Sequence, residues 1–254
     1  MPNLPTHMGL AMRVASTLAH STIDANLGTF LLGSTSPDIR VLTKGKRHET
    51  HFAPLTIEYV GTGVKGLLKR HPTLADSARV SDQTRVFLSG YFTHLVADET
   101  WILDIYRPYF DGRHLFADQV LANIWDRALQ LDMDRQTRLE MEGFELLRTH
   151  LDGSERGVGV EFIDPETLQR WREWVTEFTT WEFTWDRLRF ATHRMYADDP
   201  GAKETVEEFL QSVPSSLERV YNRVHRHRIS DYQEKVVAES VRTIKEYLHV
   251  PESD

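Results

Sequence analysis

The chain has 254 residues, a formal net charge of −8 and no cysteine. This length allows one large domain or two small ones, and the 40% of hydrophobic residues is enough for a core and argues against a disordered chain. The acidic balance argues against nucleic acid as a partner, because phosphate backbones are held mainly by Lys and Arg. The lack of cysteine excludes disulfides, thiolate zinc sites and thiol nucleophiles.

The chain shows no targeting or membrane signal. Residues 1–7 have neither the charged start nor the apolar run of a signal peptide. No segment has the roughly 18 uninterrupted apolar residues that are needed to span a membrane. We therefore expect a cytoplasmic protein without a transmembrane segment, and the sequence leaves its oligomeric state open.

Helical periodicity dominates the sequence and no strand alternation appears, which predicts an all-α, multi-helix bundle. The predicted helices cover residues 10–18, 23–32, 54–68, 81–103, 114–131, 134–150, 165–189, 202–227 and 230–248. Residues 44–47 are predicted to form a solvated turn and residues 107–112 a loop. Pro214 is expected to break or kink its helix.

A glycine-rich stretch, residues 153–159, is a candidate boundary. We expect a metal-binding helical core over residues 1–150 and a C-terminal helical extension over residues 151–254, packed on the core as one domain. The extension begins with an aromatic-rich helix, which favours a core seam. An exposed apolar or lipid-contacting surface is the alternative. The aromatic residues are Trp171, Trp174, Phe178, Trp181, Phe183 and Trp185.

The most informative feature is a histidine and an aspartate four residues apart, His94 and Asp98, in a segment with the apolar character of a buried helix. Residues at i and i+4 share a helix face, so both side chains point to the same place. Imidazole and carboxylate are both zinc ligands. Because an unpaired charge is costly in such a helix, the carboxylate must be satisfied by a cation or by donors. We interpret the pair as a metal site; a simple His–carboxylate hydrogen bond is the alternative.

Further residues of metal-ligand type lie in the first half of the chain. They are His7, Asp38, His48, His51, His114 and Asp118. Each also has an ordinary interpretation. The aspartate after Ser36-Pro37 fits a turn or a helix cap, and the histidine at position 7, in the loop before the first helix, fits a surface residue.

The remaining candidates are paired by spacing. His48 and His51 lie three residues apart, so that both, or only one, could face a site. His114 and Asp118 repeat the four-residue spacing, although an exposed start of a helix has the same pattern.

Taken in order, four sequence phrases match a known arrangement. They are Thr6-His7, Gly33-Ser-x-x-Pro-Asp38, His48-Glu-Thr-His51 and Gly90-Tyr-x-x-His94-x-x-x-Asp98. This set resembles the zinc-dependent phospholipase C family, which is related to the zinc-dependent single-strand nucleases. The resemblance covers about residues 1–125 and implies an all-α fold with zinc ions at the bottom of a cleft.

The resemblance also implies ligand sets. The first ion would be held by Asp38, His51, His94 and Asp98. The second of these aspartates would bridge to an ion held also by His7 and, in the family, by the free N-terminal amine. A third ion would take His114 and Asp118, and Asp104 stands roughly where the family has a further histidine.

The implied activity is hydrolysis of a phosphoester, either a phospholipid headgroup or a small molecule, through two or three zinc ions or similar divalent metals. Such ions polarise a phosphoryl oxygen and lower the pKa of water towards about 7. Asp38 is the candidate catalytic residue, as a ligand and as general base to the water. Glu49 and Glu99 adjoin the ligands and could orient imidazoles, or they could face solvent.

Two other functions compete. An HD-type phosphohydrolase is also all-α, but it needs a histidine followed directly by aspartate, and this sequence has no such pair. A non-catalytic helical protein could keep one structural or vestigial metal and use its C-terminal half as an interaction surface.

Overall fold

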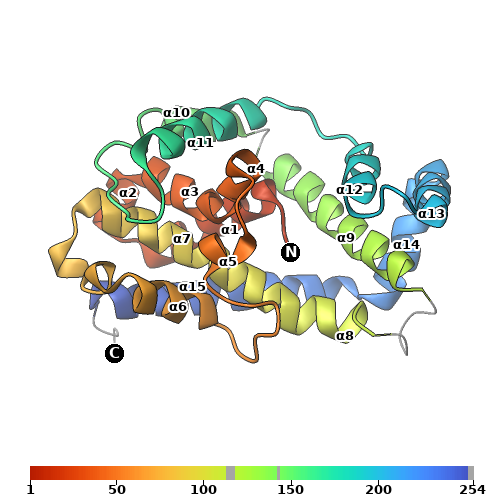
Figure 1. Ribbon diagram of the computed structural model, residues 1–254, viewed down its shortest axis with the longest axis horizontal. Coiled ribbons are helices and arrows are strands. Elements are labelled where there is room, and N and C mark those ends of the chain that lie inside the picture. The colour runs from red at the N-terminus through yellow and green to blue at the C-terminus, as the bar shows by residue number, and fades with distance from the viewer. Residues whose placement is uncertain (113–117, 142–143, 251–254) are drawn as a thin grey trace.

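The computed structural model describes residues 1–112, 118–141 and 144–250. These residues form helices and turns without a strand, which confirms the all-α prediction. Figure 1 shows α1, α3 and α7 at the centre, α10 and α11 above them, and α12, α13 and α14 at one end. None of the helices in these ranges has both the length and the apolar character needed to cross a membrane.

The elements of the first half run from α1 to α8. They are α1 (Leu4–Leu18), α2 (Ser21–Ala25), α3 (Leu27–Thr35), the 3-10 turn η1 (Ser36–Ile39), α4 (Arg40–Thr43), α5 (Arg47–His51), α6 (Thr62–Arg70), the 3-10 turns η2 (Pro72–Leu74) and η3 (Ser77–Arg79), α7 (Asp82–Thr100), the π-helical segment η4 (Trp101–Tyr106) and α8 (Arg107–Tyr109).

The second half is built from longer helices. They are α9 (Gln119–Glu140), α10 (Glu145–Leu151), α11 (Pro165–Phe178), α12 (Arg187–Met195), α13 (Pro200–Gln211), α14 (Val213–Arg223) and α15 (Arg226–Leu248). The last of them returns to the first half, where it packs against both α7 and α1. The division of the chain at residue 150 stays a prediction.

Helix α7 is the central element of the fold. It begins where the hydroxyl of Ser81 accepts a hydrogen bond from the backbone N–H of Thr84, which is a standard N-cap. Every residue from Val86 to Thr100 is buried, so the helix is enclosed on all sides rather than along one stripe. In such a helix, polar side chains are tolerated only where other elements supply partners for them. His94 and Asp98 lie in this buried part of α7.

Two glycines let α3 and α7 cross at very short range. A Cβ atom on Gly33 would lie 2.0 Å from the carbonyl oxygen of Phe87, and one on Gly90 would lie 1.9 Å from that of Phe30. Any side chain at either position would push the helices apart. This close crossing places the C-terminal end of α3 directly against the residues of α7 that form the site.

Several predicted boundaries were wrong near the N-terminus. The first helix begins at Leu4 rather than at residue 10, because Pro5 is tolerated in the first turn. The predicted helix 23–32 is divided at Asn26 and continues through Gly33, since this glycine packs on α7 instead of ending the helix. Of the predicted helix 54–68, only the part from Thr62 onward is helical, after a left-handed Gly61.

Other boundaries were wrong because tertiary contacts decided them. The predicted interruption between residues 131 and 134 is absent, because Asp132 and Asp134 are buried in α9 and hydrogen-bonded to other helices. The predicted helix 165–189 is two helices, since the hydroxyls of Thr179 and Thr180 bond back to the carbonyls of the preceding turn. The predicted loop 107–112 begins with the short helix α8.

Two predictions for the C-terminal half hold. Pro214 lies in the first turn of α14, just after α13 ends, so the expected break is confirmed. The aromatic helix contributes to the core through Trp171, which is fully buried and donates its Nε1–H to the hydroxyl of Thr35 at 3.1 Å. Trp181, later in the same series, is 43% exposed.

Candidate metal centre

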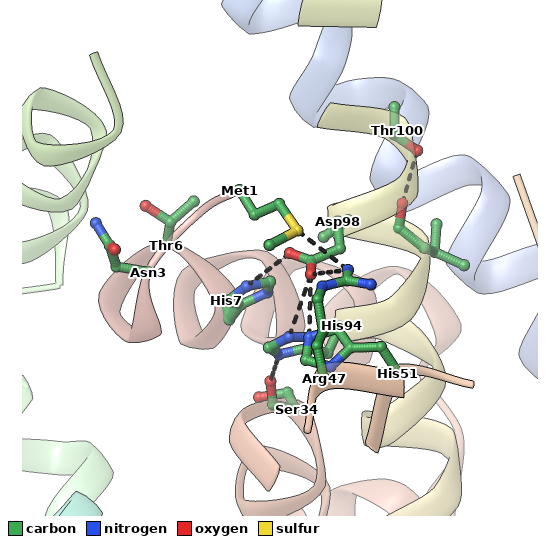
Figure 2. Close-up of polar contacts among 12 residues, drawn as sticks. Met1, Asn3, Thr6, His7, Ser34, Arg47, His51, His94, Asp98 and Thr100 are labelled. Carbon is green, nitrogen blue, oxygen red and sulfur yellow. Dashed lines mark hydrogen bonds and ion pairs between the residues drawn. The ribbon is translucent and has the colours of Figure 1, made fainter. Parts of the chain in front are cut away.

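Asp98 lies at the centre of a buried polar cluster (Figure 2). Its Oδ2 atom lies 3.2 Å from Nε2 of His51, 3.8 Å from Nε2 of His94 and 3.0 Å from an Nη atom of Arg47. Its Oδ1 atom lies 3.5 Å from Nε2 of His7. The structure thus brings together three of the predicted histidine ligands around the predicted bridging aspartate.

Four separate elements supply these side chains. His94 and Asp98 share one face of α7, as their spacing predicts. His7 comes from α1, whereas the sequence placed it in a loop, and its ring stacks on that of His94 with 3.6 Å between centroids. His51 is the last residue of α5, and Asp38 lies in η1, partly exposed.

The backbone of α3 fixes the orientation of His94. Its Nδ1 atom lies 2.8 Å from the carbonyl oxygen of Ser34. A carbonyl oxygen only accepts, so Nδ1 carries the proton and Nε2 keeps its lone pair. That lone pair faces the cluster, as metal-binding histidines require.

His51 is oriented in the same way by its neighbour. Its Nδ1 atom lies 3.0 Å from the hydroxyl of Thr50, and this hydroxyl donates its only proton to the carbonyl oxygen of Arg47. The hydroxyl therefore accepts from His51 Nδ1–H, so in the neutral tautomer the lone pair of His51 is on Nε2. Two imidazole lone pairs thus point toward one carboxylate.

The cluster contains buried polar atoms that lack a hydrogen-bond partner among the described residues. They are Nδ1 and Nε2 of His7, Nε2 of His51, Nε2 of His94 and Oδ1 of Asp98. Leaving such atoms unpaired costs about 1–3 kcal/mol each, so their concentration calls for a cation. Nitrogen and carboxylate donors of this kind suit zinc, and the residues therefore fit a divalent metal.

Two groups of possible ligand atoms overlap at His94. In one, the atoms of His7, His94 and Asp98 lie within 4.8 Å of one another; in the other, those of Asp38, His51 and His94 do. The group with Asp38 contains three of the four residues that the resemblance implies for the first ion, and the group with His7 contains both side chains that it implies for the second.

Burial and charge set the protonation states of the central pair. Burial, together with the nearby His7 and His51, holds the pKa of His94 well below its usual range. Burial acts to raise the pKa of Asp98, but the three histidines around it outweigh this effect and hold that pKa well below its usual range. The cluster therefore presents a neutral imidazole and an ionised carboxylate, which are the forms that bind metals.

Arg47 is a member of the cluster that the sequence analysis missed. It was assigned to a solvated turn, but it begins α5 and its side chain is only 16% exposed. One Nη atom donates to Asp98 at 3.0 Å and lies 3.1 Å from the sulfur of Met1. Its spacing of four residues before His51 could have indicated a shared helix face.

The cluster opens to solvent through a cavity of about 490 Å³, which we call the entry pocket. Both Asp38 and Asp98 line it, and its other walls come from the N-terminal residues, α4 and the residues after it, the middle of α9 and the end of α12. A catalytic metal site needs such an open side, whereas a structural site is closed by protein ligands.

Three predicted neighbours of the ligands have other partners. His48 is exposed, and the exposed Glu49 accepts a hydrogen bond from the backbone of Lys46 at the start of α5. Glu99 is buried, which excludes the solvent-facing alternative, and it accepts from the backbone N–H groups of residues 61, 62 and 63. Its carboxylate thus holds the start of α6 rather than an imidazole, and burial raises its pKa to about 7.

The predicted third ion site is not assembled in the part of the chain that the structure describes. Asp104 forms an ion pair with Lys235 at 2.7 Å. Asp118 is exposed and caps α9 by accepting from the backbone N–H of Val120. His114 lies outside the described residues, so the third site stays a prediction.

Comparisons with known proteins find a similarity in the first part of the chain. Residues 6–101 match the model of the family described as zinc dependent phospholipase C. The matched segment holds His7, Asp38, His51, His94 and Asp98, and it confirms the resemblance drawn from the sequence phrases. Searches of curated proteins and of solved structures find no match.

Proposed function

We propose that this chain is a metal-dependent hydrolase that cleaves phosphoester bonds with zinc or a similar divalent ion. The observation that carries the proposal is the pair of inward-facing Nε2 lone pairs, on His51 and His94, beside the buried carboxylate of Asp98. The family match over residues 6–101 supports zinc as the metal and a phosphoester as the substrate.

The proposed ligands follow the two overlapping groups of atoms. The first ion would be held by Asp38, His51, His94 and Asp98, and the second by His7 and Asp98. A bound ion of this kind supplies a Lewis acid for the phosphoryl oxygen and a water of lowered pKa. We further propose two or three ions per chain, the third depending on His114, Asp118 and Asp104.

The protein's own residues have distinct tasks in this proposal. The carboxylate of Asp38 is the partly exposed member of the cluster and lines the entry pocket, so it is placed to accept a proton from an attacking water. Ser34 and Thr50 hold the two imidazoles with their lone pairs inward. Arg47 balances the charge of Asp98 and limits its freedom to rotate.

The test is hydrolysis of a chromogenic phosphodiester by the zinc-loaded chain. His94→Ala and Asp98→Asn should each lower kcat/KM by at least about 100-fold, since each removes a donor from the centre of the cluster. His150→Ala is the matched control, because that side chain is exposed on α10 and should leave activity unchanged. Equal activity of all three variants would reject the assignment.

A non-catalytic protein with a structural ion is the second candidate. The observation that favours it is the Arg47–Asp98 ion pair, which already places one positive charge on the proposed bridging carboxylate. This function predicts that zinc raises the melting temperature while neither phosphomonoesters nor phosphodiesters are hydrolysed. The hydrolase predicts both stabilisation and turnover.

A further inference from the structure

A second cavity adjoins the entry pocket. This neighbouring pocket has a volume of about 390 Å³. The two share wall residues, namely Asn3, Leu4, Arg127 and Arg194. Together they form one groove, which we call the cationic groove, leading from the metal cluster to the exposed side chains of Trp181 and Phe190.

Positive side chains line this groove from one end to the other. They are Arg40, Lys44, Arg127, Arg187 and Arg194. Within the described residues, none of the five lies within ion-pair distance of a carboxylate. By contrast, Arg189 on the same helix as two of them pairs with both Asp186 and Glu207. A run of unpaired cations is unexpected by chance in a chain with a net charge of −8.

The carboxylates of the groove do not neutralise it. Asp38 and Asp98 are the proposed metal ligands. Asp134 is buried, accepts hydrogen bonds from Asn3 at 2.6 Å and from Thr6 at 2.8 Å, and supplies one negative charge that interacts with Arg127 and Arg187. The free positive charge therefore exceeds the free negative charge once the cluster holds its metal.

A further guanidinium lies behind the second pocket. Arg138 is only 9% exposed, and its Nε and one Nη atom have no hydrogen-bond partner among the described residues. Its guanidinium lies 5.4 Å from the ring centre of Phe178, which lines the pocket. Burial and the neighbouring Arg187 lower the pKa of Arg138 to about 10, so it remains charged at neutral pH.

The aromatic residues do not make this groove a site for a quaternary ammonium group. Phe178 already has Arg138 and Arg187 within 5.4 Å and 5.1 Å of its ring centre. Aromatic rings bind one layer of cation on each face, so this ring is occupied by the protein's own guanidinium groups. A choline headgroup here would also meet like charge from the unpaired arginines.

We propose that the cationic groove selects phosphoesters that carry a second anionic group, a phosphate or a carboxylate, over those with a choline headgroup. This inference rests on the proposed function, which places the ester phosphate at the metal cluster. The second anion would then contact Arg127, Arg187 and Arg194. Guanidinium groups suit this task because they offer paired donors to phosphate and carboxylate oxygens.

The experiment measures binding rather than turnover. Three soluble esters share a glycerophosphoryl group and carry choline, serine or inositol 4-phosphate. Each is titrated by calorimetry into the full-length protein, first with chelator and then with zinc. Binding by wild type is compared with binding by Arg194→Gln and by the double variant Arg127→Gln/Arg194→Gln. Arg242→Gln is the matched control, because it removes the same charge from an exposed position on α15, outside the groove.

The proposal predicts that the inositol phosphate ester binds at least about tenfold more tightly than the choline ester, a ratio that corresponds to about 1.4 kcal/mol. The affinity for the serine ester should lie between those for the other two. Its position shows how strongly the groove binds a carboxylate compared with a phosphate. The double variant should reduce the ratio to about two, Arg194→Gln should reduce it partly, and Arg242→Gln should leave it unchanged. Added salt should weaken the preference.

Two results would overturn the proposal: equal affinity for the three esters, or a preference that survives in the double variant with an unchanged circular dichroism spectrum. Equal binding together with hydrolysis of all three esters would reject the cationic groove and leave the proposed hydrolase standing. Arginine-dependent binding of the inositol phosphate ester without its hydrolysis would support the groove and reject the hydrolase.

Discussion

The Nδ1 atom of His94 donates a hydrogen bond to the carbonyl oxygen of Ser34 at 2.8 Å, so the central histidine of the cluster is oriented by the end of a different helix. The contact exists only because α3 and α7 cross at Gly33 and Gly90. These two glycines, which appear in the sequence phrases that resemble the family, thus allow the carbonyl oxygen of Ser34 to lie within hydrogen-bond distance of the His94 ring.

Replacing Gly90 with alanine should therefore damage both the fold and the site. The new methyl group would overlap the carbonyl oxygen of Phe30, and we expect a loss of at least about 1–3 kcal/mol in the free energy of unfolding, with weaker zinc binding. Urea denaturation and a zinc titration measure the two effects. Gly159→Ala is the control, because a Cβ there would meet only the hydroxyl of Thr84 at 3.8 Å. Equal stability of the two variants would contradict the tight crossing.

Arg47→Gln should make the protein depend more strongly on zinc. Without the guanidinium, the buried carboxylate of Asp98 loses its only permanent counter-charge within ion-pair distance among the described residues, and the metal-free protein should lose about 3 kcal/mol. Zinc should restore most of this loss, so the rise in melting temperature on adding zinc should exceed that of wild type. Arg79→Gln, which breaks an exposed surface pair, should behave as wild type. An equal zinc response in Arg47→Gln and wild type would contradict the assigned role.

Glu99→Ala should destabilise the protein without removing a metal ligand. Three backbone N–H groups, of Gly61, Thr62 and Gly63, would lose their acceptor at the start of α6, which we expect to cost about 2–3 kcal/mol. Thermal unfolding measures the loss, and zinc stoichiometry should remain that of wild type. Glu49→Ala, at an exposed cap, should cost less than about 1 kcal/mol. A loss of zinc from Glu99→Ala would show that this residue is a ligand instead.

In the metal-free protein, the contribution of His94 to stability should decrease in mild acid. Folding lowers the pKa of this imidazole from its ordinary value near 6.5. At pH values between the folded and the unfolded pKa, His94 therefore binds more protons in the unfolded chain than in the folded chain. Stability contributed by His94 is therefore present above about pH 6.5 and is lost as the pH falls, by up to about 1.4 kcal/mol per pH unit.

The measurement is the free energy of unfolding of wild type minus that of His94→Gln, between pH 7 and pH 5. Burial raises the pKa of Glu99 to about 7, so its contribution to stability increases as the pH falls, opposite to that of His94. Because Glu99 is present in both proteins, this contribution cancels in the difference. The difference should decrease as the pH falls. A difference that stays constant, or increases, would contradict the lowered pKa of His94.

The all-α class and the central metal pair could be predicted from the sequence because both depend on local spacing. His94 and Asp98 share a helix face wherever that helix lies, and an apolar helix with a carboxylate needs a partner for it. The other ligand candidates were recognised by residue type, but their grouping into ion sites came only from the resemblance. Their distances from Asp98 depend on how α1, α5 and η1 pack around α7, which no local pattern encodes.

Some predictions were wrong because tertiary contacts replaced solvent. The residues around Arg47 in the sequence are typical of a surface turn, but its guanidinium forms an ion pair with the buried carboxylate of Asp98. The sequence predicted two helices that end at residue 131 and begin at residue 134, but Asp132 and Asp134 lie within one helix and accept hydrogen bonds from the hydroxyls of Tyr221 and Thr6. Polar residues alone do not distinguish a surface from a buried hydrogen-bond network.

The central claim is that the cluster around Asp98 binds catalytic zinc, and metal content per chain tests it most directly. Elemental analysis of full-length protein, purified without chelator or a metal-affinity column and then incubated with zinc, should give two or more equivalents for wild type. His94→Ala should bind fewer, because both groups of ligand atoms contain that residue. One equivalent or none in wild type, or an unchanged content in His94→Ala, would contradict the multinuclear site.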